Sequence, residues 1–103
     1  MSFPISYVRV PWIPGRGYGT GGGLQGYLPE VVTRQAITAV FGQPDCGSED
    51  GKVSVQWCVR FGGEVIATIY DWKGGDRWHI GGKGALAVEL IGRVLGVVAE
   101  RAR

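Results

Sequence analysis

The chain has little of what metal enzymes and redox proteins need. It contains one histidine, His79, and two cysteines, Cys46 and Cys58. These residues cannot supply a zinc quartet of cysteines, a Cys-x-x-Cys redox motif or a metal site with two or more imidazoles. We therefore expect two reduced thiols, no metal and no cofactor.

The chain also lacks a large excess of either charge and has no long apolar run. With 11 Lys and Arg against 9 Asp and Glu, the formal net charge is +2, so counterion release offers no obvious source of non-specific binding to nucleic acid. The longest apolar stretch, residues 85–99, is interrupted by Glu89 and Arg93 and is shorter than the roughly 20 residues that a bilayer needs. No signal-peptide pattern opens the chain. We expect a cytoplasmic protein without a membrane span.

Glycine, by contrast, is abundant, at 19 of 103 residues. Residues 15–26 are so rich in it that no apolar period survives, which predicts a mobile loop. Residues 5–12 alternate and end among prolines, which is typical of a short edge strand. We expect residues 1–27 to hold this strand and loop and residues 28–103 the remaining elements, in a single domain.

Two segments carry helical patterns. Pro29 suits a first helical turn, an apolar stripe follows through Phe41, and Gly42 with Pro44 stops the helix. Residues 85–101 form the second predicted helix, with Glu89 and Arg93 as a stabilising pair. Glycines at 92 and 96 would let that helix approach its neighbours closely.

Strands are predicted between the two helices. Residues 53–61 alternate strictly, and residues 64–72 return across a two-residue turn at Gly62 and Gly63, which sets Trp57 opposite Thr68. A third strand follows Gly74 and Gly75 at residues 77–80. If that turn also has two residues, His79 lies opposite Tyr70 on the apolar face, whereas a one-residue slip would place Trp78 there.

The order from residue 28 is therefore α-β-β-β-α, with an extra strand before it. This order predicts an α+β two-layer sandwich, in which two helices cover one face of an antiparallel sheet. The same order occurs in the double-stranded RNA-binding domain, whose second helix opens with several lysines. Here only Lys83 stands at that place.

Catalytic signals are sparse. Residues 17–22 fit G-x-G-x-x-G literally, but antiparallel hairpins follow instead of the parallel strand that a dinucleotide fold needs. His79 could act with Asp71 or Asp76 as an acid-base pair, yet no serine stands near them. We predict a protein that is not an enzyme.

The densest cluster of rings and charges lies in the second hairpin, at residues 70–83. Tryptophan and arginine commonly anchor protein interfaces, so this cluster predicts a partner-binding surface. The alternative is a nucleic-acid-binding patch that uses Arg60, Lys73, Arg77 and Lys83. A homodimer is a further possibility for partners. The predicted binding residues are Tyr70, Trp72, Lys73, Arg77, Trp78, His79 and Lys83.

Three runs in the second half of the chain, at residues 53–57, 67–73 and 78–82, resemble short accessory proteins of tailed phages, especially those that infect actinobacteria. The resemblance transfers no catalytic residue. It implies a viral protein that binds and modulates a host protein in the host cytoplasm.

Overall fold

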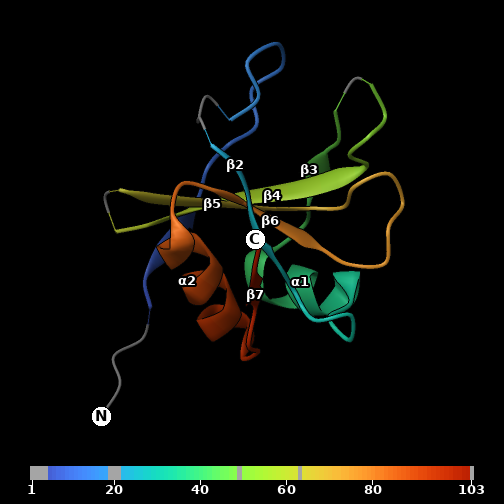
Figure 1. The fold of residues 1–103 in the computed structure, drawn as a ribbon. Coiled ribbons are helices and arrows are strands. Elements are labelled where there is room, and N and C mark those ends of the chain that lie inside the picture. The colour runs from blue at the N-terminus through green and yellow to red at the C-terminus, as the bar shows by residue number, and fades with distance from the viewer. Residues whose placement is uncertain (1–4, 19–21, 49, 63, 103) are drawn as a thin grey trace.

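Figure 1 shows the computed structural model of the chain, which describes residues 5–18, 22–48, 50–62 and 64–102. Within these residues seven strands form one antiparallel sheet, accompanied by two helices, so the predicted α+β class is confirmed. In chain order the elements are β1 (Tyr7–Arg9), β2 (Gly23–Tyr27), α1 (Arg34–Phe41), β3 (Asp45–Cys46), β4 (Val55–Phe61), β5 (Val65–Tyr70), β6 (His79–Gly82), α2 (Ala85–Leu95) and β7 (Glu100–Arg101).

The strand order in the sheet is β1-β4-β5-β6-β2-β7, and β3 pairs with β4 beside β1. Figure 1 places both helices on one side of the sheet, while the described parts of the β1–β2 and β3–β4 connections rise from the other side. We call these sides the helix face and the open face. No helix within the described residues is long and apolar enough to cross a membrane.

The core lies between the sheet and the helices. Large apolar side chains from the central strands meet apolar side chains from both helices there, since alternate residues of a strand point to the same face. The largest fully buried contributors are Trp57, Val59, Ile69, Ile80, Ile37, Ile91, Val88 and Leu28. The indole of Trp57 donates to the carbonyl of Gly42 at 2.8 Å, which satisfies the one polar atom of that ring.

The predicted register of the first hairpin is wrong by one residue. Phe61 pairs with Val65, which leaves three residues between the strands instead of two, and Trp57 lies opposite Ile69 rather than Thr68. Gly62, with φ of 58°, supplies the left-handed backbone in that loop, and Gly63 lies outside the described residues. Because side chains alternate, this slip turns Thr68 and Tyr70 to the open face.

The third strand combines features of both predicted alternatives. His79 does pair with Tyr70, as the first alternative has it. Both residues nevertheless lie on the open face, not on the apolar face, because the slip in the first hairpin carries over to the next strand. Trp78 packs against the core instead, edge-on to Trp57 with ring centroids 5.4 Å apart.

The N-terminal region is more ordered than predicted. The short edge strand is confirmed as β1, but the expected mobile loop at residues 15–26 is wrong for its last part, which forms most of β2. That strand pairs with β6 on one side and β7 on the other, so it lies inside the sheet. Gly26 allows this pairing because it has no Cβ. A Cβ at this position would collide with the carbonyl of Glu100 and lie 2.9 Å from Val88.

Both helices are shorter than predicted. Helix α1 starts after Thr33, whose hydroxyl accepts from the backbone N–H of Ala36 at 3.1 Å, so Pro29 precedes the helix by a turn. Helix α2 ends at Gly96, which adopts the left-handed conformation with φ of 74°. The chain then turns back into β7, a strand that the sequence did not reveal. The predicted Glu89–Arg93 ion pair is present at 2.7 Å.

Candidate functional site

A row of aromatic side chains crosses the open face of the sheet. Strand pairing sets Tyr70, His79 and Tyr27 side by side on β5, β6 and β2. The ring of Tyr70 lies edge-on to His79 with centroids 5.3 Å apart, and Tyr27 lies edge-on to His79 at 5.0 Å. Rings in this arrangement support one another by edge-to-face contacts. We call Tyr27, Tyr70, Trp72 and His79 the aromatic row.

Trp72 extends the row beyond the end of β5. Its ring is nearly parallel to that of His79, at 24° and 6.5 Å between centroids, and its residue surface is 39% exposed. The Asp71 carboxylate fixes this position by accepting from the backbone N–H groups of Ser54 and Val55, at 2.7 and 3.2 Å. Asp71 is therefore a structural acceptor, and its carboxylate also acts on His79, where its charge raises the pKa of the ring.

Cationic groups flank the row at both ends. The ammonium groups of Lys52 and Lys73 lie 6.0 and 5.7 Å from the centroid of Trp72. At the other end the guanidinium of Arg77 lies 4.5 Å from the centroid of Tyr27 and pairs with Glu100 at 2.7 Å. Distances of this size are those of cation–π contacts. The open face thus presents rings flanked by cationic side chains, of which Lys52 also pairs with Asp50 at 3.7 Å.

Burial within the row shifts the pKa values of two of its members. Desolvation, helped by the charge of Arg77, lowers the pKa of His79, although Asp71 opposes this. Desolvation likewise raises the pKa of Tyr70, with Tyr27 adding to the effect. His79 is therefore a neutral ring at pH 7, and the row carries its positive charge on the flanking lysines and arginine.

The predicted binding residues divide into two groups. Tyr70, Trp72, Lys73, Arg77 and His79 come together on or beside the aromatic row. Trp78 packs against the core, and Lys83 lies in the bend between β6 and α2, at the end of β6 away from His79. Arg60, from the nucleic-acid alternative, lies opposite Ile66, toward the far end of β4 and β5 from the row.

Sequence analysis did not identify two residues of this surface, Tyr27 and Lys52. Tyr27 lies in a glycine-rich segment, where alternation of Gln25 and Tyr27 with Leu24, Gly26 and Leu28 is a faint strand signal. Lys52 lies in a polar turn that carries no signal for a site. Its carbonyl accepts from the backbone N–H of Lys73 at 2.7 Å, and this bond joins the two lysine-bearing loops.

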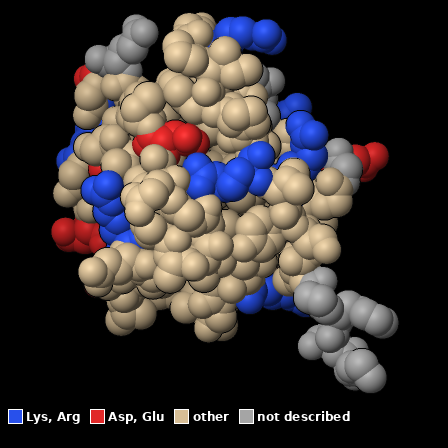
Figure 2. Space-filling view, turned by 180° about the vertical axis from the view of Figure 1, so that it is seen from behind, with Lys and Arg blue, Asp and Glu red and all other residues tan. Residues whose placement is uncertain are grey.

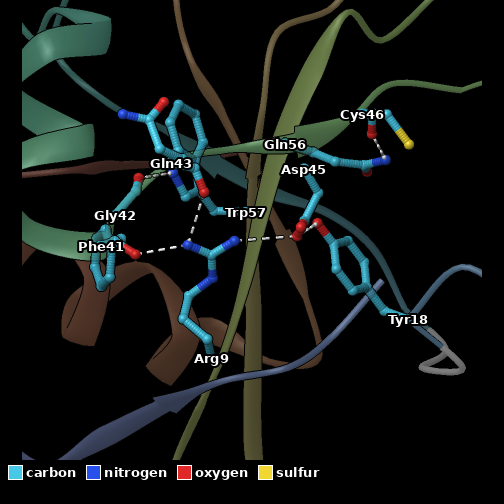
Figure 3. A network of polar contacts seen from close by, with 9 residues as sticks. All are labelled: Arg9, Tyr18, Phe41, Gly42, Gln43, Asp45, Cys46, Gln56 and Trp57. Carbon is cyan, nitrogen blue, oxygen red and sulfur yellow. Dashed lines mark hydrogen bonds and ion pairs between the residues drawn. The ribbon is translucent and has the colours of Figure 1, made fainter. Parts of the chain in front are cut away.

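The N-terminal segment is attached to the sheet by a polar network at the β1–β3 edge (Figure 3). The guanidinium of Arg9 donates to the carbonyls of Phe41 and Gln43 and pairs with Asp45 at 3.1 Å. The Tyr18 hydroxyl donates to the same carboxylate at 2.6 Å. Burial, followed by this bond to Asp45, raises the pKa of Tyr18 strongly, so the phenol remains a donor.

Most of the surface is uncharged on the side that Figure 2 shows. Basic groups lie among these uncharged areas, and an acidic group adjoins the basic group at the centre of the view. The described residues also contain no group of three or more His, Cys, Asp or Glu side chains that could hold a metal ion. Comparison with protein-family models, with curated proteins and with solved structures returned no match to this chain.

Proposed function

We propose that this protein binds single-stranded nucleic acid by stacking bases on the aromatic row. The observation that carries the proposal is the alignment of four rings across neighbouring strands of an open sheet face, with lysines beside the exposed one. Base–aromatic stacking contributes about 1–3 kcal/mol per base and tolerates any base, because every base has a π face. Lys52 and Lys73 suit the phosphates that connect such bases.

Single strands fit this surface better than duplexes. The bases of a duplex are already paired and stacked on one another, so they cannot lie against protein rings until they are unstacked, which costs a few kcal/mol per base. The low net charge of +2 supports the same preference, because duplex binding depends mainly on many phosphate contacts.

The test is fluorescence anisotropy with labelled oligonucleotides and the variant Trp72→Ala. We expect the variant to bind a short single strand about five- to a hundredfold more weakly than the unchanged protein, as the loss of one stacked base implies. Arg60→Gln, on the same face but outside the row, is the control and should bind normally. No binding by the folded, unchanged protein at low salt would refute the proposal, and so would undiminished binding by Trp72→Ala.

A second candidate is capture of a host protein, as the resemblance to phage accessory proteins implies. The exposure of Trp72 favours it, because tryptophan is among the commonest anchors of protein interfaces. Affinity capture from a host lysate, with and without nuclease, separates the two functions. One protein retained despite nuclease, and lost with Trp72→Ala, would support the host partner, whereas retention that nuclease abolishes would support nucleic acid.

A further inference from the structure

The open face also holds a pocket beside the aromatic row. Its volume is about 360 Å³, within the range of about 300–1,000 Å³ that small-molecule sites occupy. Strands β2, β4, β5 and β6 contribute to it, and the segment before β2 adds Arg16 and Tyr18. Trp72 and Tyr70 belong both to the row and to the pocket, so a polymer stacked on the row would run past the pocket opening.

Glycine makes the floor of the pocket accessible. Gly81 has its neighbours so close that a Cβ there would collide with the Thr68 hydroxyl and lie 3.1 Å from the ring of Tyr70. The hydroxyl and the ring therefore lie directly over the glycine backbone. Because no side chain grows from Gly81, the Thr68 hydroxyl is left as a donor and acceptor at the pocket floor.

The orientation of the Gln56 amide is fixed by its neighbour. Its Nε2 donates to the carbonyl of Cys46 at 2.7 Å, and a carbonyl can only accept (Figure 3). The amide oxygen is thus turned away from Cys46 and is an acceptor that Gln56 can offer to a ligand, beside the second N–H of the same amide. Tyr18, held by Asp45, gives the pocket a third aromatic ring besides Tyr70 and Trp72.

Arg16 brings a positive charge to the pocket. It is exposed, it lines the pocket, and none of the ion pairs within the described residues involves it. A guanidinium presents a planar fork of donors that matches a phosphate group. One cavity therefore combines aromatic walls, a hydroxyl and an amide oxygen that suit the polar edge of a ring, and a guanidinium that suits an anion.

We propose that this pocket binds one nucleotide unit, with the base against Trp72 and Tyr70 and the phosphate at Arg16. Thr68 and Gln56 would contact the polar edge of the base, where exocyclic amino and ring N–H groups are donors for the Gln56 oxygen. The inference rests on the proposed function, since it assigns to the same face a place for one base of the bound strand. It goes further, because it predicts that a free mononucleotide binds.

The experiment is titration of the full chain with each common ribonucleoside 5′-monophosphate, followed by calorimetry and by amide chemical shifts. Ribose 5-phosphate and inorganic phosphate serve as probes without a base. We expect at least one monophosphate to bind and to shift the amides of residues around Thr68 and Gly81. The probes without a base should bind more weakly, because they lack the ring that the aromatic walls hold.

Two variants test the assigned contacts. Thr68→Val keeps the shape of the side chain and removes the hydroxyl, and should weaken monophosphate binding about two- to tenfold. Arg16→Gln should weaken monophosphate binding about three- to tenfold while leaving nucleoside binding unchanged. Ile66→Val, on the same face of β5 but outside the pocket, and Arg60→Gln are the matched controls, and thermal unfolding confirms that each variant folds.

The outcomes separate this inference from the proposed function. Trp72-dependent binding of oligonucleotides without any binding of monophosphates would overturn the pocket inference and leave the proposed function standing. Monophosphate binding without oligonucleotide binding would do the reverse. Equal affinity for ribose 5-phosphate and the monophosphates, or normal binding by both Thr68→Val and Arg16→Gln, would also overturn the nucleotide assignment.

Discussion

At the scale of single residues, His79 makes the stability of the fold depend on pH. Its pKa is lowered in the folded protein from the ordinary value of 6.5, first by desolvation and then by Arg77. The unfolded chain therefore binds the proton more readily, and the free energy of unfolding falls as pH drops through 6.5 toward the lowered pKa. Well above pH 6.5 the histidine is neutral in both states and makes no such contribution.

We expect urea unfolding to show a decrease in stability below pH 6.5 that His79→Gln reduces. Glutamine keeps polar atoms at the position but does not titrate. The comparison is between the two proteins at matched pH, since carboxylates elsewhere titrate equally in both. An identical pH dependence in the variant would contradict a neutral His79 within the aromatic row.

Asp45 is the second residue whose removal has a calculable effect. It accepts from Tyr18 and pairs with the partly buried Arg9, so Asp45→Ala removes the acceptor of the Tyr18 hydroxyl and the carboxylate partner of Arg9, which keeps its bonds to two backbone carbonyls. We expect the variant to lose about 1–3 kcal/mol of stability, the typical cost of unsatisfied buried polar groups. Asp76→Ala, at an exposed position, should stay within about 0.5 kcal/mol.

Equilibrium unfolding in urea measures both changes. Tyr18→Phe should fall between the two aspartate variants, because it removes one hydrogen bond and keeps the ion pair. Equal stability of Asp45→Ala and Asp76→Ala would show that the network does not attach the N-terminal segment to the sheet.

At the scale of elements, β2 depends on the close approach that Gly26 permits. A methyl group there would meet the carbonyl of Glu100 on β7 and Val88 on α2. Gly26→Ala should therefore cost about 1–3 kcal/mol, the usual range for overpacking. Gly23→Ala, in the same strand, has open space around its Cβ and should change stability little. Similar melting temperatures for the two variants would contradict the packing of α2 on β2.

The elements also show how far the sequence alone can go. Alternation in residues 53–61 identifies β4 and the side of it that faces the core, because polar and apolar residues there differ sharply. It cannot fix the register of β5, since Ile66 and Tyr70 are nearly as apolar as Val65 and Ile69. Packing against the helices decides between these two registers of β5. The register in turn sets the length of the loop at Gly62.

The same ambiguity affects the candidate site. The sequence singles out residues of the second hairpin for their rings and charges, and most of them meet on the open face. The place of Trp78 depends on strand register, which the sequence leaves open, and in the structure this ring packs against the core. Tyr27 joins the row only through long-range pairing of β2 with β6, which no local pattern reports.

At the scale of the whole molecule, the fold turns a glycine-rich chain into a sheet with two different faces. Large apolar side chains and two helices occupy the helix face. Glycines at 81, 82, 22 and 23 leave the open face hollowed beside the rings. Shape and ring chemistry, rather than total charge, therefore distinguish the open face from the remaining surface.

Because few charges lie at the row and the pocket, the salt dependence of binding is a quantitative test. Three of the cations at the row and the pocket are Lys52, Lys73 and Arg16. Each phosphate contact to a single strand contributes about −0.7 to the slope of log K against log salt. If each of these cations contacts one phosphate, the slope should be about −2. Lys73→Gln should make the slope shallower by about 0.7, whereas Lys83→Gln should leave it unchanged. A much steeper slope, or equal effects of the two substitutions, would place binding on diffuse surface charge and not on the aromatic row.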